Sequence, residues 1–478
     1  MKLSFLLNDI VDEPIHEGDA SNICFEPQLC EKNDILFLMN EKAINDYTML
    51  LPRAAAVITT RPIQCTSNTQ IFTTKSIRDT LSKACARMYC KDLSKIRFIG
   101  ITGTNGKSTT AILLEKILSD CGYKVGYIGT GIIRIGKEIL SKKYYSMTTP
   151  PPDMLFKSIG KMEDHDVEII IMEVSSHALD QSRVSPISFD IGIFTNLSEE
   201  HLDYHKSMSE YFNAKKNLLK KSKIKIVNSD DYYGRSILNE YENIDGCGAD
   251  FFKNVQISIL NSLEFNGNKF RYKSDISEDN IELKLAGTYN IYNAALAIRA
   301  AEKLGIPLSK IKKTLEEIRE INGRFSLIDD NIKIVIDYAH TISAFDNLLK
   351  NIYSIKKQGQ NLILVFGCGG DRDKNKRGQM GLIAEKFADK IIVTSDNPRG
   401  EDPLSIIEEI LRPMKSTPTI IENREEAIRA AIFSANDGDI VAIVGKGPED
   451  YMISQGARYP FSEKEIIKTA LKERRNCE

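Results

Sequence analysis

The sequence lacks a dominant charge, a long apolar run and a clear leader segment. Its 64 Lys and Arg are balanced by 66 Asp and Glu, which leaves a formal net charge of −2 and disfavours a nucleic-acid binder that relies on bulk positive charge. No apolar run approaches the ~20 residues of a membrane span. The apolar run 3–7 is soon followed by Asp9, Asp12 and Glu13, unlike a typical signal peptide. We therefore expect a cytoplasmic protein with no nucleic-acid or membrane partner.

Cysteine is scattered and follows no ligand pattern. The chain has 9 Cys and no CxxC pair, so neither a disulfide framework nor a zinc site is indicated. We expect reduced thiols with mostly structural roles. They are Cys24, Cys30, Cys65, Cys85, Cys90, Cys121, Cys247, Cys368 and Cys477.

The length and the apolar pattern indicate several α/β domains. At ~150 residues per domain, 478 residues suggest about three. Residues 1–88 contain strand-like runs at 35–39 and 55–59 and a helical stretch at 76–88, residues 89–322 show strands followed by glycine-rich turns, and residues 323–478 contain four apolar runs at 332–336, 362–366, 391–394 and 440–444. Helical patterns separate these four runs, which predicts a doubly wound, Rossmann-like C-terminal sheet.

A glycine-rich loop follows the strand-like run 96–99. Residues 100–108 read Gly-Ile-Thr-Gly-Thr-Asn-Gly-Lys-Ser and open an amphipathic helix. Such a loop directs backbone N–H groups at phosphates, with Lys107 between phosphates and the Ser108 hydroxyl on Mg²⁺. Ile101 stands where the strict spacing has its first glycine, and the alternative is a plain glycine turn. We predict a P-loop ATPase-like central domain that binds ATP or GTP through Gly103, Thr104, Asn105, Gly106, Lys107, Ser108 and Thr109.

Two further residues have chemistry suited to this loop. Glu173 ends the apolar run 167–172, where a carboxylate is well placed to hold Mg²⁺, although a capping or ion-paired glutamate is an equal alternative. Lys215 projects from the middle of the apolar face of a helix that a Ser207–Glu210 capping box begins. A buried ammonium must be paired, neutralised or modified, for example as a carbamate that ligates a metal, unless the side chain reaches solvent.

Taken together, the motifs resemble the Mur ligase family of ATP-dependent amino-acid ligases in peptidoglycan precursor synthesis. They run in family order along the chain: Gly103–Ser108, Thr148-Thr-Pro150, Met172–Asp180 with Gln181 and Arg183, Thr195–Ser198, His201–His205, Ala214-Lys215, Asp337–Thr341, Gly367–Asp373, Asp396–Arg399 and Gly445-Lys-Gly447. The resemblance implies three domains that hold a UDP-linked substrate (1–88), ATP (89–322) and an amino acid (323–478), in a protein that we expect to be a monomer.

The resemblance also implies roles for single residues. Mg²⁺ would be held by Ser108, Glu173, His201 and a carbamylated Lys215, with Lys107, Lys215 and His201 as the catalytic set. The nucleotide would be bordered by Asn293, Arg324, Asp337 and His340. The UDP-N-acetylmuramoyl dipeptide would contact Thr148, Thr149, Ser175, Gln181 and Arg183. The amino acid would contact Arg372, Asp396, Asn397, Arg399, Gly445 and Glu449.

Arg399 bears on the identity of the amino acid. An arginine can grip a carboxylate bidentately and would repel the ammonium of a lysine side chain. Family members that add meso-diaminopimelate carry the motif that Asp396–Arg399 resembles. The resemblance therefore implies transfer of meso-diaminopimelate to UDP-N-acetylmuramoyl-L-alanyl-D-glutamate through an acyl phosphate, with meso-lanthionine or L-lysine as alternatives.

Three positions depart from the family pattern. Glu200 stands where an aspartate is usual, Ile342 where proline is usual, and Pro448 where a histidine is usual. A folate-polyglutamylating relative or a catalytically idle nucleotide-binding paralogue are the remaining alternatives. Lys107, Glu173, His201 and Lys215 are all present, which disfavours the idle paralogue.

Overall fold

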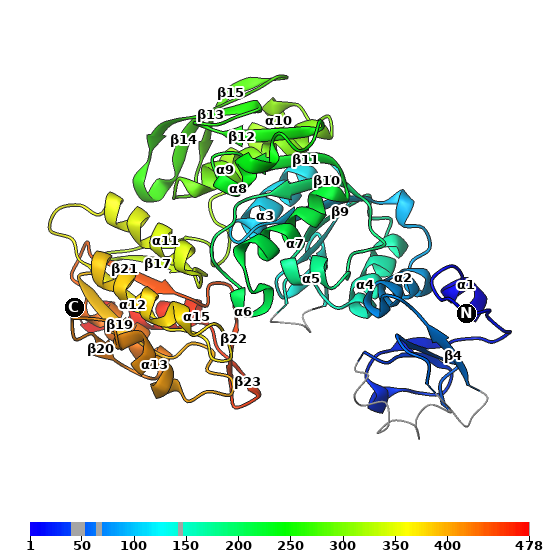
Figure 1. Ribbon diagram of the computed structural model, residues 1–478. Coiled ribbons are helices and arrows are strands. Elements are labelled where there is room, and N and C mark those ends of the chain that lie inside the picture. The colour runs from blue at the N-terminus through cyan, green and yellow to red at the C-terminus, as the bar shows by residue number, and fades with distance from the viewer. Residues whose placement is uncertain (40–52, 64–68, 142–146, 478) are drawn as a thin grey trace.

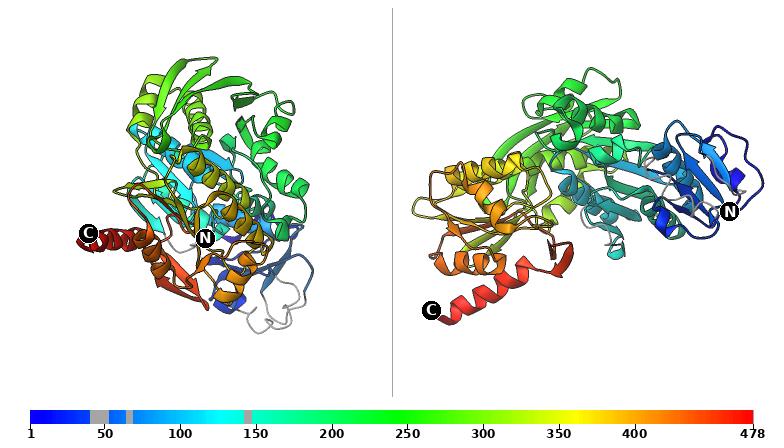
Figure 2. Two further views of the ribbon diagram at one scale, coloured as in Figure 1. Left: turned by 90° about the vertical axis from the view of Figure 1, so that its left-hand side faces the viewer. Right: turned by 60° about the horizontal axis from the view of Figure 1, so that its bottom comes forward.

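The computed structural model describes residues 1–39, 53–63, 69–141 and 147–477. Three main sheets follow one another along the chain. The N-terminal and C-terminal sheets lie at opposite ends of the molecule, and the largest sheet lies between them (Figures 1 and 2).

The N-terminal sheet is parallel throughout, with strands in the order β1-β2-β3-β4. Its strands β2 and β3 and the helix α2 correspond to the three elements predicted here. Helix α2 packs on α4 of the following region, so one apolar core runs through both regions. The elements are α1 (Leu3–Leu7), β1 (Asn22–Cys24), β2 (Asp34–Phe37), β3 (Ala56–Thr59), β4 (Gln70–Thr73) and α2 (Ile77–Tyr89).

The central sheet has the order β15-β14-β13-β12-β11-β10-β5-β9-β6-β7-β8. Its middle strands are parallel, and antiparallel strands extend both edges. The strands are β5 (Arg97–Thr102), β6 (Val125–Gly129), β7 (Ile132–Ile135), β8 (Glu138–Ser141), β9 (Ile169–Glu173), β10 (Phe189–Phe194), β11 (Ser222–Asn228), β12 (Ile244–Gly248), β13 (Asn254–Ser262), β14 (Asn268–Ser274) and β15 (Glu278–Leu283).

Helices cover both faces of this sheet because successive apolar side chains of a strand point to opposite faces. Ile99 and Ile101 of β5 join the core formed with α3 and α9, whereas Phe98 joins the core formed with α4 and α7. The helices are α3 (Lys107–Asp120), α4 (Pro152–Asp164), α5 (Ser176–Asp180), α6 (Leu202–His205), α7 (Met208–Lys220), α8 (Tyr232–Ile237), α9 (Tyr289–Lys303) and α10 (Leu308–Glu317).

The C-terminal sheet has the order β16-β17-β21-β18-β19-β20, with one antiparallel edge strand, β16. Separate apolar cores lie on its two faces, as the doubly wound prediction requires. The elements are β16 (Ser326–Asp329), β17 (Lys333–Asp337), α11 (Ile342–Ile355), β18 (Leu362–Phe366), α12 (Asn375–Phe387), β19 (Lys390–Val393), α13 (Pro403–Leu411), β20 (Thr419–Ile420), α14 (Arg424–Ser434), β21 (Ile440–Val444) and α15 (Glu463–Cys477).

A hairpin of β22 (Tyr451–Ser454) and β23 (Ala457–Pro460) is an addition that the sequence patterns did not predict. The predicted α/β class with a parallel central sheet is confirmed. Among the described residues, no helix combines the length and apolarity that a membrane crossing needs. The described cysteines with described side chains are free thiols; Cys65 and the side chain of Cys477 lie outside the described part.

Candidate active site

The predicted phosphate loop connects the end of β5 to the start of α3. Gly103 and Gly106 have φ values of 147° and 84°, in a region that side chains disfavour. A Cβ on Gly103 would lie 1.9 Å from Thr195 Oγ1, and one on Gly106 would lie 2.3 Å from Asn293 Oδ1. Glycine is therefore required at both positions, and Asn293 of α9 lies directly against the loop.

The two lysines of the predicted site meet at one carbonyl oxygen of this loop. Lys107 Nζ donates to Gly103 O at 3.0 Å and to Thr104 O at 2.8 Å. Lys215 Nζ donates to the same Gly103 O at 2.8 Å, from a side chain that is only 2% exposed. Burial and the positive charge of Lys107 hold the pKa of Lys215 well below its usual range.

Ser108, Glu173 and Arg324 form a second polar cluster beside the loop. Ser108 Oγ donates to Glu173 Oε2 at 2.9 Å and accepts from Arg324 Nη2 at 3.0 Å. Tyr127 and Thr130, which the sequence analysis did not single out, also donate to Glu173, at 2.6 Å from the Tyr127 hydroxyl. Tyr127 lies within β6, the neighbour of β9, and Thr130 directly follows β6, and this place near the carboxyl end of the strand was the available indication.

The oxygen donors of this cluster are of the kind that Mg²⁺ prefers. A hydroxyl and a fully buried carboxylate lie in contact at the start of α3. Among the described residues there is no group of three or more His, Cys, Asp or Glu arranged to hold a metal. Lys215 fits a metal as a carbamate oxygen donor and does not fit as an ammonium. The Ser108 hydroxyl and the Glu173 carboxylate are too few ligands for Mg²⁺ by themselves. Further ligands, such as a neutral histidine, phosphate oxygens or this carbamate, would complete the site.

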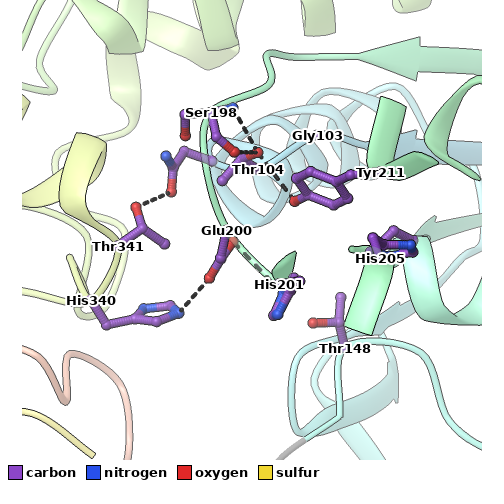
Figure 3. Close-up of polar contacts among 12 residues, drawn as sticks. Gly103, Thr104, Thr148, Ser198, Glu200, His201, His205, Tyr211, His340 and Thr341 are labelled. Carbon is purple, nitrogen blue, oxygen red and sulfur yellow. Dashed lines mark hydrogen bonds and ion pairs between the residues drawn. The ribbon is translucent and has the colours of Figure 1, made fainter. Parts of the chain in front are cut away.

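Glu200 lies between two of the predicted histidines (Figure 3). Its carboxylate is 3.7 Å from His201 Nε2 in the central region and 3.7 Å from His340 Nε2 in the C-terminal region. Burial and the positive charges around it lower the pKa of His201 to about 3. Burial also lowers the pKa of His340 to about 4. Both imidazoles are therefore neutral at neutral pH, so His201 retains a lone pair suitable for a metal.

The phosphate loop also contacts the C-terminal region directly. Asn105 Nδ2 donates to Ser343 Oγ at 3.0 Å, and Thr341 Oγ1 donates to Asn105 Oδ1 at 3.3 Å. Asp337, at the end of β17, accepts the backbone N–H groups of Phe325 and Ala339, both at 2.7 Å. Among the predicted nucleotide residues, Thr109 is buried in the first turn of α3.

The residues predicted to contact the dipeptide substrate lie together next to Glu173. Thr149 Oγ1 donates to the Glu173 carbonyl oxygen at 2.9 Å and accepts from Ser175 N at 2.9 Å. Arg183 donates to Thr149 O at 2.8 Å and to Gln181 Oε1 at 2.7 Å. Thr148 Oγ1 accepts from Thr130 Oγ1 at 3.3 Å. The five residues thus form one polar cluster, partly buried, at the carboxyl end of β9.

Two arginines of the predicted amino-acid pocket, Arg372 and Arg399, lie side by side. A Cβ on Gly369 would lie 2.8 Å from Arg399 Nη1, so the Arg399 guanidinium covers this glycine. Arg399 donates to Gly370 O at 2.7 Å, and Arg372 donates to Asp371 O at 3.2 Å. Burial and the charge of Arg399 lower the pKa of Arg372. Among the described residues neither guanidinium has a carboxylate within ion-pair distance, although Asp203 and Asp371 act on Arg372 from farther away, so a ligand carboxylate would relieve the repulsion between the two arginines.

The β22 strand holds the Arg399 loop in place. Arg399 has a φ of 53°, an uncommon conformation for a residue with a side chain. Its N–H donates to Ile453 O at 3.1 Å, and its carbonyl accepts from Gln455 N at 2.6 Å. Ile453 N also donates to Asn397 Oδ1 at 2.9 Å. The unpredicted hairpin therefore fixes the loop that carries the specificity prediction.

A buried lysine, Lys446, joins the remaining pocket residues. Its fully buried Nζ donates to Asn397 Oδ1 at 3.1 Å and to Glu449 Oε2 at 3.3 Å, and lies 3.9 Å from Asp396 Oδ1. A Cβ on Gly445 would lie 2.6 Å from Asp396 Oδ2. The sequence analysis quoted Lys446 in a motif without giving it a role. Its position between two glycines at a strand end was the available indication.

Two segments of the chain match models of domains from the same family. Residues 101–301 match the Mur ligase middle domain, and residues 323–447 match the Mur ligase glutamate ligase domain. A protein of Aquifex aeolicus named UDP-N-acetylmuramoyl-L-alanyl-D-glutamate--2,6-diaminopimelate ligase is 40% identical over 424 residues, which cover 87% of this chain and 86% of the relative.

Solved structures agree with the sequence relatives. A structure of a ligase with the same name has a TM-score of 0.70 and 26% identity, with 99% of this chain and 100% of that chain covered. The MurF ligase of Thermotoga maritima in complex with ADP has a TM-score of 0.63 at 18% identity, covering 96% and 98% of the two chains, and shows the same fold. The resemblance inferred from the motifs is confirmed: the chain belongs to the Mur ligase family.

Proposed function

We propose that this chain joins meso-diaminopimelate to UDP-N-acetylmuramoyl-L-alanyl-D-glutamate at the expense of ATP, in peptidoglycan precursor synthesis. Support comes from the name of the 40% identical relative and from the polar clusters at the carboxyl ends of the central and C-terminal sheets. The N-terminal region (1–88) holds the UDP end, residues 89–322 hold ATP, and residues 323–478 hold the amino acid.

The reaction has two balanced steps. The γ-phosphoryl group passes from ATP to the γ-carboxylate of D-glutamate, which gives an acyl phosphate and ADP. A neutral amine of the amino acid then attacks the acyl carbon, a C–N bond forms, inorganic phosphate leaves and the amine releases a proton. The protein brings anions together, so positioning and positive charge provide most of the catalysis.

Lys107 and a bound Mg²⁺ would supply that positive charge at the nucleotide. Lys107 reaches the phosphates when its hydrogen bonds to the loop carbonyls of Gly103 and Thr104 are exchanged. Ser108, Glu173, His201 and a carbamylated Lys215 would hold Mg²⁺, which supplies charge neutralisation when it is bound. Asn293, Arg324, Asp337 and His340 border the nucleotide. The ADP complex of a structural neighbour supports an adenine nucleotide here.

The low pKa of Lys215 supports its carbamylation. The neutral amine attacks CO₂, an N–C bond forms and one proton is released, which leaves an anion beside Lys107 at a place where an unpaired ammonium is poorly tolerated. The test is ¹³C NMR of the full chain in ¹³C-bicarbonate. We expect a carbamate resonance that the Lys215→Ala variant lacks, and equal spectra for the two proteins would contradict the assignment.

The neighbouring guanidinium groups of Arg372 and Arg399 are the observation that supports meso-diaminopimelate. An amino acid with a carboxylate at its far end places that group against the two cations, whereas L-lysine places an ammonium there. Meso-lanthionine offers the same carboxylate and remains an alternative substrate.

The deciding experiment measures phosphate release by the purified full chain with ATP and UDP-N-acetylmuramoyl-L-alanyl-D-glutamate. Meso-diaminopimelate, meso-lanthionine and L-lysine are supplied in turn, and the peptide product is identified by mass spectrometry. We expect kcat/KM to be highest with meso-diaminopimelate. A preference for L-lysine would overturn the role of Arg399, and no product with any of the three would overturn the function.

We further propose that the protein works as a monomer in the cytoplasm. Light scattering coupled to size-exclusion chromatography tests the first point. A mass near the 53.8 kDa of one chain is expected, and twice that mass would contradict it.

A further inference from the structure

The candidate nucleotide and amino-acid sites are joined by Tyr338, which no part of the proposed mechanism uses. Tyr338 follows Asp337 at the carboxyl end of β17 and lies in the loop before α11. One side of this residue faces the nucleotide residues and the other faces the amino-acid residues, so its contacts can be followed in both directions.

On the nucleotide side, the ring of Tyr338 supports Arg324. The Arg324 guanidinium carbon lies 4.7 Å from the ring centroid, within the range of a cation–π contact. The same guanidinium donates to Ser108 Oγ at 3.0 Å. The ring therefore fixes the arginine that touches the first turn of α3.

On the amino-acid side, the hydroxyl of Tyr338 donates to Glu449 Oε1 at 3.3 Å. The other oxygen of Glu449 accepts from Asn397 Nδ2 at 2.8 Å and from Lys446 Nζ at 3.3 Å. The Tyr338 hydroxyl thus helps to decide how the Glu449 carboxylate is turned within the predicted pocket.

The backbone around Tyr338 leaves little room for it to move independently. A Cβ on Gly447 would lie 2.6 Å from Tyr338 Cβ, and a Cβ on Gly323 would lie 2.2 Å from Pro448 N. The segment that enters the C-terminal region, the Tyr338 loop and the Gly445–Glu449 loop are therefore in direct contact. A shift of Arg324 on nucleotide binding would be passed to Glu449 through packed atoms.

We propose that Tyr338 is a positioning residue that couples the nucleotide site to the amino-acid pocket, with its ring orienting Arg324 and its hydroxyl orienting Glu449. This inference rests on the proposed function, because it requires that Glu449 belongs to the amino-acid pocket. Nucleotide binding then raises affinity for the amino acid, and the reverse holds by linkage.

Two variants separate the two contacts. Tyr338→Phe keeps the ring under Arg324 and removes the hydrogen bond to Glu449. We expect the KM for meso-diaminopimelate to rise about tenfold, as for loss of a hydrogen bond to a charged group, while kcat and the KM for ATP measured at subsaturating meso-diaminopimelate change less than about twofold. Tyr338→Leu removes both contacts, and we expect the KM for ATP to rise as well.

Tyr353→Phe is the matched control, because Tyr353 is on α11 and 52% exposed. A double-mutant cycle with Glu449→Gln adds a readout that a general structural role would not change. If the hydroxyl acts through Glu449, the KM of the double variant equals that of Glu449→Gln alone, and full additivity of the two effects contradicts the inference.

The outcomes also separate this inference from the proposed function. Wild-type protein that makes no product with meso-diaminopimelate contradicts the function itself. Active wild type combined with an unchanged amino-acid KM in Tyr338→Phe contradicts only the positioning role. Equal increases in all three substrate KM values, with a lower kcat, also contradict it, because they indicate a general loss of structure.

Discussion

Two buried lysines, one on each side of the candidate active site, have opposite surroundings. Lys215 donates to a single carbonyl oxygen that it shares with Lys107, and no described carboxylate lies within ion-pair distance of it. Lys446 is equally buried but lies among Asn397, Glu449 and Asp396. Burial alone therefore does not indicate what a lysine does.

The difference assigns different chemistry to the two amines. A buried amine near another cation loses its proton easily and can react, as proposed for the carbamate at Lys215. A buried amine among carboxylates and an amide oxygen orders its partners, here the side chains of the predicted amino-acid pocket. The predictions below test this contrast.

The largest expected effect is on turnover. Lys215→Ala removes the proposed oxygen donor, so we expect kcat to fall by at least about 100-fold. Lys216→Ala is the control, since Lys216 is the next residue of α7 and pairs with Glu240 at 2.9 Å instead. Phosphate release is the measurement. Full activity of Lys215→Ala without added bicarbonate would contradict the carbamate.

The next largest effect should be on the KM for the amino acid, without an effect on the KM for ATP. Arg399→Ala removes a guanidinium that would bind the distal carboxylate. We expect the KM for meso-diaminopimelate to rise about 10- to 100-fold and the KM for ATP to change less than about twofold. Initial rates at varied concentrations of each substrate test this. An unchanged KM for meso-diaminopimelate would remove Arg399 from the pocket.

The free energy of unfolding should differ clearly between variants of Lys446 and Lys215. Lys446→Met removes the cation that lies between Asp396 and Glu449, which costs about 3–5 kcal/mol of unfolding free energy. Lys215→Met removes a poorly paired buried amine, so we expect a loss below about 1 kcal/mol or a gain. Urea unfolding of both variants gives the comparison. Equal losses would show that the two environments do not differ in energy.

The smallest expected effect is on the pH dependence of stability. Burial lowers the pKa of His340 to about 4 in the folded protein. In the unfolded chain the same histidine has a pKa of ~6.5 and binds a proton at a higher pH. The free energy of unfolding therefore falls as the pH drops from ~6.5 to about 4. The pKa of Asp396 is lowered instead, despite its burial, chiefly by Lys446 and Arg424, so its contribution is lost only below ~3.8.

Two variants test whether His340, and not Asp396, causes the loss of stability at the higher pH values. His340→Gln should flatten the slope of unfolding free energy against pH between ~6.5 and about 4, and Asp396→Asn should leave this slope unchanged. Urea unfolding at several pH values is the measurement. A flattened slope in Asp396→Asn alone would reverse the assignment of the two groups.

The sequence by itself determined the α/β class, several of the buried strands and the family. Apolar runs at 189–194, 362–366 and 440–444 coincide with β10, β18 and β21, because buried parallel strands need continuous apolar residues. Ser207 caps α7 through Glu210 N at 3.2 Å, as its spacing predicts, and Lys215 is buried on the predicted face. These features depend on residues close in sequence, and the family motifs run in chain order.

Only the tertiary structure decided which groups meet. The carbonyl oxygen of Gly103 accepts hydrogen bonds from Lys107 and from Lys215, and Lys215 is 112 residues away in the sequence. Glu200 lies between His201 of the central region and His340 of the C-terminal region. The β22–β23 hairpin and the links from Tyr338 to Arg324 and Glu449 had no periodic pattern to predict them. These contacts form because strand ends from separate sheets meet at the candidate active site. Helix or strand propensity and the spacing of apolar residues describe only neighbours in the sequence, so they do not predict such contacts.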